Sequence, residues 1–485
     1  MNIKKDEKLL NTRRDFIKTA STAAAGFMIV PRHVLGGNGF TAPSDKLAIA
    51  AVGVGGKGYS DISYFHKSGK AEIEFLCDVD DVQSAAARKA FPKAKYYKDW
   101  REMFDKKARK FDAVSVSTPD HNHAIITMHA MQLGKHVYVQ KPLTHDIYEA
   151  RMLTEAAKKY KVVTQMGNQG ASIDGTRQLT EWYNAGLIGD VHTVYAWTDR
   201  PIWPQGIQWP AVPAQIPATL DWNLWLGTAQ QKNFVDKLVP FNWRGWWDYG
   251  TGALGDMGPH LIEPAFRMLD LTHAKNVQAS VGTVFLDRGK PGYFPESCPP
   301  SSHATLTFPK TAKTQGDITL HWMDGGIQPA RPAELEGSEM FGDGKNGMLF
   351  IGTKGKMMAN SWGANPRLLP LSKNDEINVP ETITRVPGQA DGHYGQWVEA
   401  SIAGYGKMEV SSPFEKAGPL TEATLMANLA IRGYDIKETL ANGRATYPGR
   451  YITYEWDSEN MKVTNFDAAN QFVKREYREG WSLGV

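Results

Sequence analysis

The fold of this chain is decided by residues 47–58, Leu-Ala-Ile-Ala-Ala-Val-Gly-Val-Gly-Gly-Lys-Gly. Residues 47–52 form a continuous apolar run, which is typical of a parallel strand buried on both faces. Gly53, Gly55 and Gly58 follow at once, and a helical pattern begins directly behind them. A tight glycine turn between a buried strand and a helix lets a phosphate group approach the backbone at the helix amino terminus.

An acidic residue completes the pattern. A second expected strand, Ala71 to Cys77, ends at Asp78, twenty residues after Gly58. A strand, G-x-G-x-x-G, a helix and a later acidic residue together form the dinucleotide-binding fingerprint, which is far more specific than the glycines alone. The Asp78 carboxylate would accept hydrogen bonds from the adenosine ribose and repel a 2′-phosphate, which predicts NAD rather than NADP. The alternative is a glycine turn without a ligand. The residues expected to hold the pyrophosphate are Gly53, Gly55, Gly56 and Gly58.

Strand and helix patterns alternate in the first third of the chain and then give way to strands. Alternation predicts an N-terminal, doubly wound parallel sheet of the Rossmann type. Later runs rich in β-branched and aromatic residues predict a C-terminal α/β domain with one open, largely antiparallel sheet. The expected N-terminal strands are 47–52, 71–77, 113–117, 137–139 and 162–166, with helices near 83–91, 122–133 and 146–160. The expected C-terminal strands are 191–197, 277–285, 304–308, 318–322 and 348–351, followed by helices at 394–404 and 420–433.

Composition excludes several classes of protein. With 42% hydrophobic and 22% charged residues, the 485-residue chain is globular rather than disordered. Its two cysteines, Cys77 and Cys298, exclude a disulfide framework and a cysteine metal cluster. The net charge of +3 comes from residues 1–43, with seven Lys/Arg against three Asp/Glu, so the remainder is almost neutral. A neutral body argues against binding to nucleic acid.

The amino terminus is expected to be an export signal. Thr12-Arg13-Arg14-Asp15-Phe16-Ile17-Lys18 precedes a mildly apolar run from Ala20 to Val30. Paired arginines before such a run predict the twin-arginine route and a periplasmic location, and the run is too short to span a bilayer. The alternative is an ordinary first helix. The expected organisation is therefore a signal and linker over 1–43, a nucleotide-binding domain over 44–167 and a substrate domain over 168–485.

Four further motifs occur in order along the chain. They are Ser117-Thr118-Pro119-Asp120-His121-Asn122-His123, then Gln140-Lys141-Pro142-Leu143, then Met166-Gly167-Asn168-Gln169, and finally Asp256-Met257-Gly258-Pro259-His260 behind Trp243-Arg244-Gly245-Trp246-Trp247. With the glycine segment, they closely resemble the Gfo/Idh/MocA oxidoreductases, in particular an exported branch, over roughly residues 45–435. The resemblance implies NAD(P)-dependent redox chemistry at a sugar or polyol carbon, and a homo-oligomer formed through the open sheet.

The resemblance also assigns residues. Lys141 matches the lysine of the family's E-K-P element, and Asp256 and His260 match its D-x-x-x-H pair. Gln140 stands in place of the family's glutamate and so loses its charge, and the Lys141–Pro142 bond is often cis in relatives. Further cofactor contacts are expected from Ser117, Thr118, Pro119, His123, Gln140 and Asn168, and substrate contacts from Trp243, Arg244 and Trp247.

These side chains suit oxidation of an alcohol, which needs a hydride acceptor and a base for the hydroxyl proton. We expect His260 to be the base, Lys141 to stabilise the oxygen, and Asp256 to orient the imidazole. Pro259 predicts a helix that begins there, with Asp256 in the preceding loop. The alternatives are a structural Asp–His capping pair and a surface lysine.

Other polar and aromatic groups remain open to two interpretations. His121 and His123 are either a weak metal pair or part of a nicotinamide pocket or helix cap. Eight tryptophans lie between Trp197 and Trp247, where core packing competes with stacking against a sugar ring. Arg244 either binds a substrate hydroxyl or carboxylate, or forms an ion pair within its loop.

Three functional interpretations remain. The first is an exported NAD-dependent dehydrogenase acting on a ring hydroxyl of a sugar or glycoside, such as the 3-position. The second is a redox-neutral, NAD-dependent glycosidase of the same superfamily, which oxidises the ring, eliminates the aglycone, adds water and reduces the ring again. The third is a non-catalytic sugar-binding protein. None of the three involves nucleic acid, a metal, or a membrane after signal processing.

Overall fold

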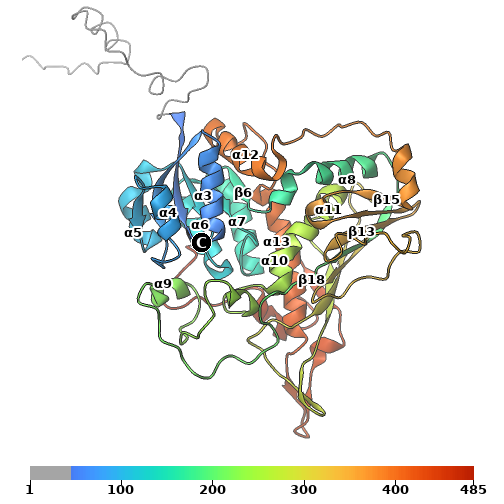
Figure 1. Cartoon of the computed structure of the whole chain (residues 1–485). Coiled ribbons are helices and arrows are strands. Elements are labelled where there is room, and N and C mark those ends of the chain that lie inside the picture. The colour runs from blue at the N-terminus through green and yellow to red at the C-terminus, as the bar shows by residue number, and fades with distance from the viewer. Residues whose placement is uncertain (1–44, 485) are drawn as a thin grey trace, which may run out of the picture. The chain divides into compact units, whose positions relative to one another are not determined.

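Six parallel strands form the N-terminal sheet of the computed structural model, in the order β3-β2-β1-β4-β5-β6 (Figure 1). This is the strand order of a doubly wound Rossmann fold, as predicted. The structure describes residues 45–484, so the proposed export signal lies outside the described residues. The strands are β1 (Leu47–Val52), β2 (Ala71–Cys77), β3 (Lys95–Tyr97), β4 (Ala113–Val116), β5 (His136–Val139) and β6 (Thr164–Met166). The helices are α3 (Lys57–Lys67), α4 (Ala85–Ala90), α5 (Trp100–Lys107), α6 (His123–Gln132) and α7 (Ile147–Tyr160).

Nine strands form the second sheet, in the order β15-β14-β13-β7-β12-β11-β8-β18-β19. All neighbouring pairs are antiparallel except β7 with β12, which confirms the open, largely antiparallel sheet. The central strands are β7 (Val191–Trp197), β8 (Asn276–Val281), β11 (Ser302–Phe308), β12 (Ile318–Met323) and β13 (Gly347–Gly352). The outer strands are β14 (Lys356–Ala359), β15 (Arg367–Leu369), β18 (Tyr454–Asp457) and β19 (Lys462–Val463). Two small hairpins are separate, β9 (Phe285–Asp287) with β10 (Lys290–Pro291), and β16 (Glu438–Thr439) with β17 (Ala445–Thr446).

Helix α13 (Phe414–Gly433) joins the two sheets. It contacts α7, β6, β8 and β11, and almost every residue after Pro419 is buried (Figure 1). In β11, Ala304, Leu306 and Phe308 are buried while the intervening His303, Thr305 and Thr307 are half-buried, so one face packs on the core and the other is open. The other helices are α8 (Asp174–Asn184), α9 (Trp222–Leu226), α10 (Gly252–Leu261), α11 (Glu263–Leu269) and α12 (Gln389–Ala403).

Two helices contain a proline and begin earlier than predicted. Pro259 lies inside α10, which begins seven residues earlier, so Asp256 and His260 share one helix and the predicted helix start at Pro259 is wrong. Likewise α13 begins at Phe414 and contains Pro419. A proline removes only one backbone hydrogen bond, and burial of these two helices in the core outweighs that local penalty.

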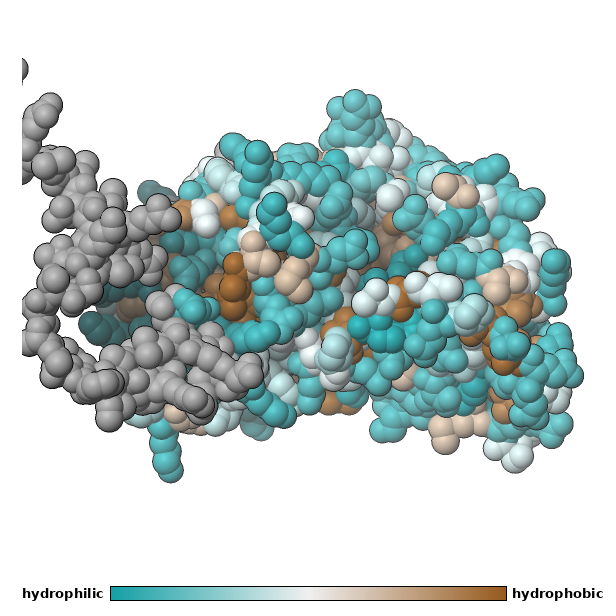
Figure 2. All heavy atoms as spheres, turned by 90° about the horizontal axis from the view of Figure 1, so that it is seen from above, coloured by the Kyte–Doolittle hydropathy of each residue, from teal (hydrophilic) through white to brown (hydrophobic). Residues whose placement is uncertain are grey.

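The outer surface is polar. Seen from above, the molecule is predominantly hydrophilic, with apolar side chains in small separate groups (Figure 2). No helix among residues 45–484 is long and apolar enough to cross a membrane.

A buried carboxylate ties the loops at the carboxyl edge of the Rossmann sheet together. Asp61 on α3 is fully buried. Its oxygens accept hydrogen bonds from Lys57 Nζ at 2.7 Å, Ser117 Oγ at 2.9 Å, Gln140 Nε2 at 2.9 Å and the Tyr394 hydroxyl at 3.1 Å. The Gln140 amide therefore donates to a carboxylate, which a glutamate at this position cannot do while ionised. Gln140 thus has a specific partner that accepts from its amide.

Gln140→Glu should destabilise the fold in a pH-dependent way. Asp61 would then face a second carboxylate, which raises the pKa of the introduced glutamate in the folded state. The penalty is therefore absent below about pH 4 and grows as the pH rises towards 7. A shift of about two pKa units would lower the unfolding free energy at pH 7.5 by about 3 kcal/mol. Urea unfolding at pH 4.5 and 7.5 measures the difference. Gln208→Glu, at an exposed position, is the matched control; equal effects of both variants at both pH values would contradict the proposed pairing.

Candidate active site

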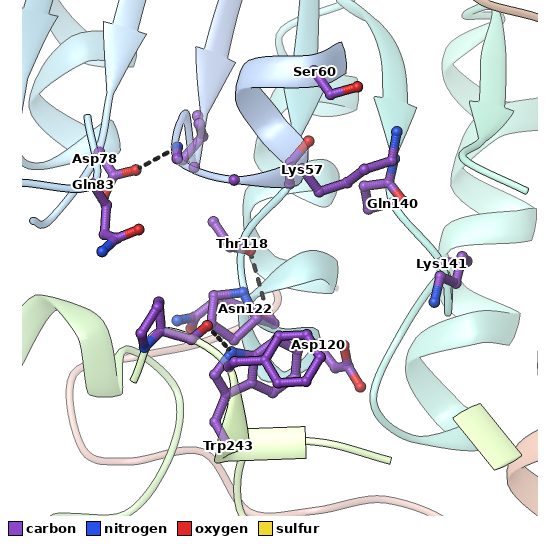
Figure 3. A pocket seen from close by; sticks show the side chains of 18 of the residues that line it. Lys57, Ser60, Asp78, Gln83, Thr118, Asp120, Asn122, Gln140, Lys141 and Trp243 are labelled. Atoms are coloured by element: carbon purple, nitrogen blue, oxygen red, sulfur yellow. Dashed lines mark hydrogen bonds between the residues drawn. The ribbon is translucent and has the colours of Figure 1, made fainter. Parts of the chain in front are cut away.

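A cavity of about 780 Å³ runs along the carboxyl edge of the Rossmann sheet and is closed by segments of the second domain. In Figure 3 the glycine loop and Asp78 lie at one end and Lys141 at the other, with Asp120 and Trp243 on the opposite side from the glycine loop. The structure brings most of the predicted site residues to its wall: Gly53, Gly55, Gly56, Asp78, Ser117, Thr118, Pro119, Gln140, Lys141, Trp243, Arg244, Asp256 and His260. Four predicted residues do not line it: Gly58, His123, Asn168 and Trp247.

The glycine loop is shaped for a dinucleotide. Gly53 has a φ of 77°, which a residue with a side chain rarely adopts. Gly58 lies beneath the loop, where a Cβ atom would come within 1.8 Å of the Gly53 carbonyl oxygen. The loop can therefore close tightly over the first turn of α3, at whose amino terminus a pyrophosphate would lie. The Gly53 amide donates to the Cys77 carbonyl at 2.8 Å, and the Gly55 amide donates to Asp78 at 3.2 Å. The backbone shape of the loop fits NAD, and contacts of Gly53, Gly55 and Gly56 with the phosphates stay predictions.

Asp78 stabilises the glycine loop directly. Its Oδ2 accepts hydrogen bonds from the Val54 amide at 2.9 Å and the Gly55 amide at 3.2 Å, and its Oδ1 accepts one from the Asp80 amide at 3.0 Å (Figure 3). Burial raises the pKa of this carboxyl, and the three amides partly oppose that shift. A carboxylate has about four acceptor positions, so this group can accept a further hydrogen bond. A contact with the adenosine ribose stays a prediction.

A segment of the second domain covers the nucleotide end of the cavity. We call residues 217–226 the strap. The Asp81 amide donates to the Thr219 carbonyl at 3.1 Å, and the Asp221 amide donates to the Val79 carbonyl at 2.9 Å. The strap is therefore bonded to the residues that directly follow Asp78. Its Leu220, Leu224 and Trp225 form an apolar part of the cavity wall.

Lys141, Arg244 and Asp256 form a compact charged group at the other end. Lys141 Nζ lies 2.7 Å from Asp256 Oδ1 and 2.7 Å from the Asp256 carbonyl oxygen. Arg244 Nε lies 3.5 Å from the same Oδ1. Burial alone would raise the pKa of Asp256, but Lys141 and Arg244 outweigh it and lower the pKa to about 2. Asp256 is thus ionised throughout the physiological range and holds Lys141 in place.

His260 lies one helical turn after Asp256 but is not bonded to it. Its Nδ1 is buried and has no hydrogen-bond partner among the described residues. Asp256 is bonded to Lys141 instead, so it does not orient the imidazole as predicted. Burial, reinforced by the charge of Lys141, lowers the pKa of His260 to about 3. The imidazole is therefore neutral at pH 7 and able to accept a proton.

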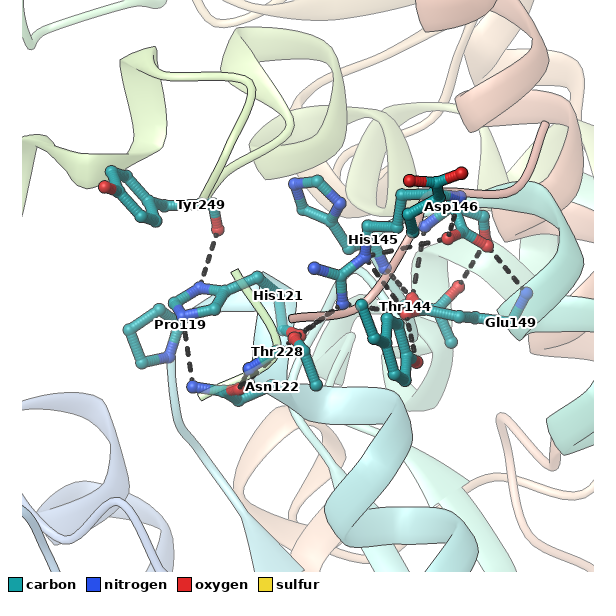
Figure 4. A network of polar contacts seen from close by, with 12 residues as sticks. Pro119, His121, Asn122, Thr144, His145, Asp146, Glu149, Thr228 and Tyr249 are labelled. Atoms are coloured by element: carbon teal, nitrogen blue, oxygen red, sulfur yellow. Dashed lines mark hydrogen bonds and ion pairs between the residues drawn. The ribbon is translucent and has the colours of Figure 1, made fainter. Parts of the chain in front are cut away.

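His121 and His123 contact the backbone. His123 Nδ1 lies 2.8 Å from the Pro142 carbonyl and its Nε2 lies 2.8 Å from the Thr118 carbonyl. It therefore connects the end of β4 to the segment that carries Lys141, whose bond to Pro142 is cis. The ring of His121 lies between the carbonyls of Trp225 and Tyr249, and burial lowers its pKa to about 3 (Figure 4). Both histidines position the site from outside the cavity.

The C-terminal tail also contacts the turn formed by His121 and Asn122. Arg475 donates to Glu149 Oε1 at 2.8 Å and to Thr228 Oγ1 at 2.9 Å, and it bonds to the His121 carbonyl. The Tyr477 hydroxyl donates to Glu149 at 2.6 Å. Figure 4 shows Glu149 and Thr228 in one polar network with His121 and Asn122. Arg478 then binds Asn223 of the strap, with Nη1 at 2.9 Å from its Oδ1. No motif in the tail indicates this role.

The tryptophan-rich region is mainly core. Trp247 is buried, its ring packs against the Arg432 guanidinium 5.3 Å away, and it does not line the cavity, so its contact with substrate stays a prediction that this position does not support. Trp243 and Arg244 do line the cavity. The Arg244 guanidinium lies between the rings of Phe241 and Trp243, at 4.4 and 4.3 Å. Stacking of this kind fixes a cation beside Asp256.

Among the residues of the cavity wall that sequence reasoning missed, three lie close to the polar groups described above: Lys57, Tyr394 and Trp362. Lys57 lies within the glycine segment itself, and its Nζ bonds to Asp61 and, at 2.6 Å, to the Tyr394 hydroxyl. Its position between Gly56 and Gly58 in the sequence could have indicated that it lies at the site. Tyr394 and Trp362 come from distant parts of the chain and no motif marks them. Trp362 is the tryptophan whose ring lies nearest to His260, at 5.6 Å.

Comparisons with known proteins agree with this geometry. Two family models match: the oxidoreductase family's NAD-binding Rossmann fold over residues 47–168, and its C-terminal alpha/beta domain over residues 186–287. An uncharacterized oxidoreductase of Streptococcus pneumoniae is 30% identical over 161 residues, 33% of this chain and 41% of that protein. A glycosyl hydrolase family 109 protein of Shewanella pealeana is 26% identical over 168 residues, 30% of this chain and 37% of that protein. The chain thus spans about two fifths of these relatives' length.

Solved structures share the fold. GenD2 from gentamicin A biosynthesis, in complex with NAD, has a TM-score of 0.52 at 16% identity and covers 83% of this chain and 96% of its own. Levoglucosan dehydrogenase, in complex with NADH and levoglucosan, has a TM-score of 0.51 at 15% identity and covers 79% of this chain and 96% of its own. With its NAD-binding Rossmann domain followed by the family's C-terminal α/β domain, the chain belongs to the Gfo/Idh/MocA oxidoreductases.

Proposed function

We propose that this NAD-binding oxidoreductase acts on a ring hydroxyl of a sugar or glycoside. The observation that carries the proposal is the grouping of Lys141, Asp256 and neutral His260 in the same cavity as the glycine loop. Solved structures of the same fold in complex with levoglucosan and with UDP-GlcNAcA support a carbohydrate substrate. The 3-position remains the expected carbon.

Each residue of the reacting end has its own part in the chemistry. NAD, when bound, supplies the hydride acceptor. His260 accepts the hydroxyl proton, because burial keeps its imidazole neutral. Lys141 directs one ammonium hydrogen to the Asp256 carboxylate and one to the Asp256 carbonyl, which leaves a third to stabilise the substrate oxygen as charge develops. Asp256 keeps that ammonium in position. Arg244 adds a second cation at the same end of the cavity.

A redox-neutral glycosidase is the second candidate. It is favoured by the relatives named glycosyl hydrolase family 109, which match over about a third of this chain. The same base and lysine would serve both reactions, which differ in whether the hydride returns to the ring. The test is incubation of the purified protein with a panel of glycosides, with and without added NAD, followed by mass spectrometry. Ring oxidation that requires NAD indicates a dehydrogenase, and cleavage without added NAD indicates the glycosidase. A non-catalytic protein would give neither product.

We also propose export by the twin-arginine route to the periplasm, on the basis of Arg13 and Arg14. Replacing both by lysine should retain the precursor in the cytoplasm, since the arginine pair is what the export machinery recognises. Fractionation and immunoblotting of cells expressing the full chain measure this. Lys4→Arg with Lys5→Arg is the matched control, and unchanged periplasmic yield of the Arg13/Arg14 variant would contradict the assignment.

Loss of the base or the lysine should affect turnover more than binding. His260→Ala should lower kcat by about 10²–10⁴, the usual effect of losing a general base. Lys141→Met should also lower kcat, while the NAD Kd stays within about twofold because neither side chain is part of the glycine loop. His192→Ala and Lys158→Met are surface controls. Steady-state kinetics and NAD titration test this; normal kcat in folded His260→Ala would remove His260 from the mechanism.

The pH profile should have no acid limb near the usual histidine pKa. His260 must be neutral to accept a proton, and its pKa is lowered to about 3. We therefore expect kcat/KM for the oxidation to stay constant from about pH 7 down to about pH 5. In Lys141→Met the acid limb should move to higher pH, because the ammonium that opposes protonation is gone. A wild-type limb centred between about pH 6 and 7 would contradict the assignment.

A further inference from the structure

Trp362 occupies a strained backbone position beside the reacting groups. It lies in the turn between β14 and β15 with φ 66° and ψ 10°, the left-handed region that residues with a Cβ rarely adopt. Its side chain is 38% exposed, whereas the other tryptophans of the described chain are buried or half-buried. Strained backbone and an exposed indole are both unfavourable. Such outliers persist where the surrounding structure holds them for a function.

Neighbouring residues hold Trp362 in this conformation. The Trp362 carbonyl accepts a hydrogen bond from Thr176 Oγ1 at 3.1 Å. Within the turn, the Asn360 amide donates to the Ala364 carbonyl at 2.8 Å. On the other side Gly170 leaves room for the indole, since a Cβ there would lie 2.7 Å from Trp362 Cβ. The ring is therefore presented rigidly rather than by a loose loop.

The ring faces the reacting end of the cavity. Its centroid lies 5.6 Å from that of His260, with 47° between the ring planes, and both residues line the cavity. None of the hydrogen bonds of the described residues involves the indole N–H. Trp362 thus offers a partly exposed indole ring and an N–H donor without a hydrogen-bond partner among the described residues, beside the expected base.

We propose that Trp362 is the platform on which the substrate ring stacks, and that it selects six-membered rings with a continuous face of C–H groups, as in pyranosides. The face of an indole is negative and attracts the weakly positive C–H groups of a saturated ring. Stacking there holds the ring's hydroxyl edge against His260 and Lys141. This inference rests on the proposed sugar-hydroxyl chemistry and names the residue that selects the ring.

The test uses Trp362→Phe, Trp362→Ala and Trp362→Gly in the full chain loaded with NAD. Calorimetry with a panel of pyranosides should show the pyranoside Kd raised at least about tenfold in the Trp362→Ala and Trp362→Gly variants. The increase should be smaller in Trp362→Phe. NAD Kd should stay within about twofold. Trp362→Gly also removes the backbone strain, so its Tm should equal or exceed that of the wild type although it binds sugar worse. Tyr451→Ala, an exposed aromatic outside the cavity, is the control.

The outcomes separate this inference from the proposed function. Unchanged pyranoside Kd in the Ala and Gly variants would overturn the platform, even if the wild type turns the sugars over. A tenfold rise in NAD Kd would also overturn it, because the ring would then serve the nicotinamide. Wild-type protein that binds pyranosides through Trp362 but yields no oxidised or cleaved product would retain the platform and refute the chemistry. Wild-type protein that binds no pyranoside would refute both.

Discussion

A fully buried carboxylate must be neutralised and hydrogen-bonded on all sides, and Asp61 meets this requirement by drawing four segments to one point. Lys57 comes from the glycine loop, Ser117 from the end of β4, Gln140 from the end of β5 and Tyr394 from α12. Because Gln140 immediately precedes Lys141, the position of the expected catalytic lysine depends on the same carboxylate as the phosphate loop. The cofactor end and the reacting end are therefore fixed together.

A second shared carboxylate sets the chemistry at the reacting end. Asp256 contacts both Lys141 and Arg244 and so holds two cations at this end of the cavity. Burial, together with the positive charge of Lys141, lowers the pKa of His260 and keeps its imidazole neutral. A neutral base and a charged donor can thus act on one oxygen at the same pH. His260 and Lys141 are ordinary side chains, and their different roles arise from where the fold places each of them.

Sequence reasoning succeeded where the signal was local. The bounds of β1 follow from a continuous apolar run that ends at Gly53, and those of β2 from a run in which apolar residues predominate and which ends at Asp78. It failed where contacts between residues far apart in the sequence determine the structure. Pro259 is tolerated in α10 because that helix is buried in the core, and Trp247 turns towards Arg432, far along the chain. Trp362 carries no motif, and its importance appears only once folding places it beside His260.

The strap covers the cofactor end of the cavity, and the two proposed reactions differ in whether the cofactor has to leave. A dehydrogenase releases the reduced cofactor in every cycle, whereas a redox-neutral enzyme retains it, so cofactor release governs the first and not the second. Thr219 and Asp221 bond the strap to the residues behind Asp78, and Arg478 anchors it to the C-terminal tail through Asn223. Cofactor exchange must break these contacts or pass around them. The residues at the reacting end are compatible with either reaction, so the two would differ in how often the cofactor has to pass the strap.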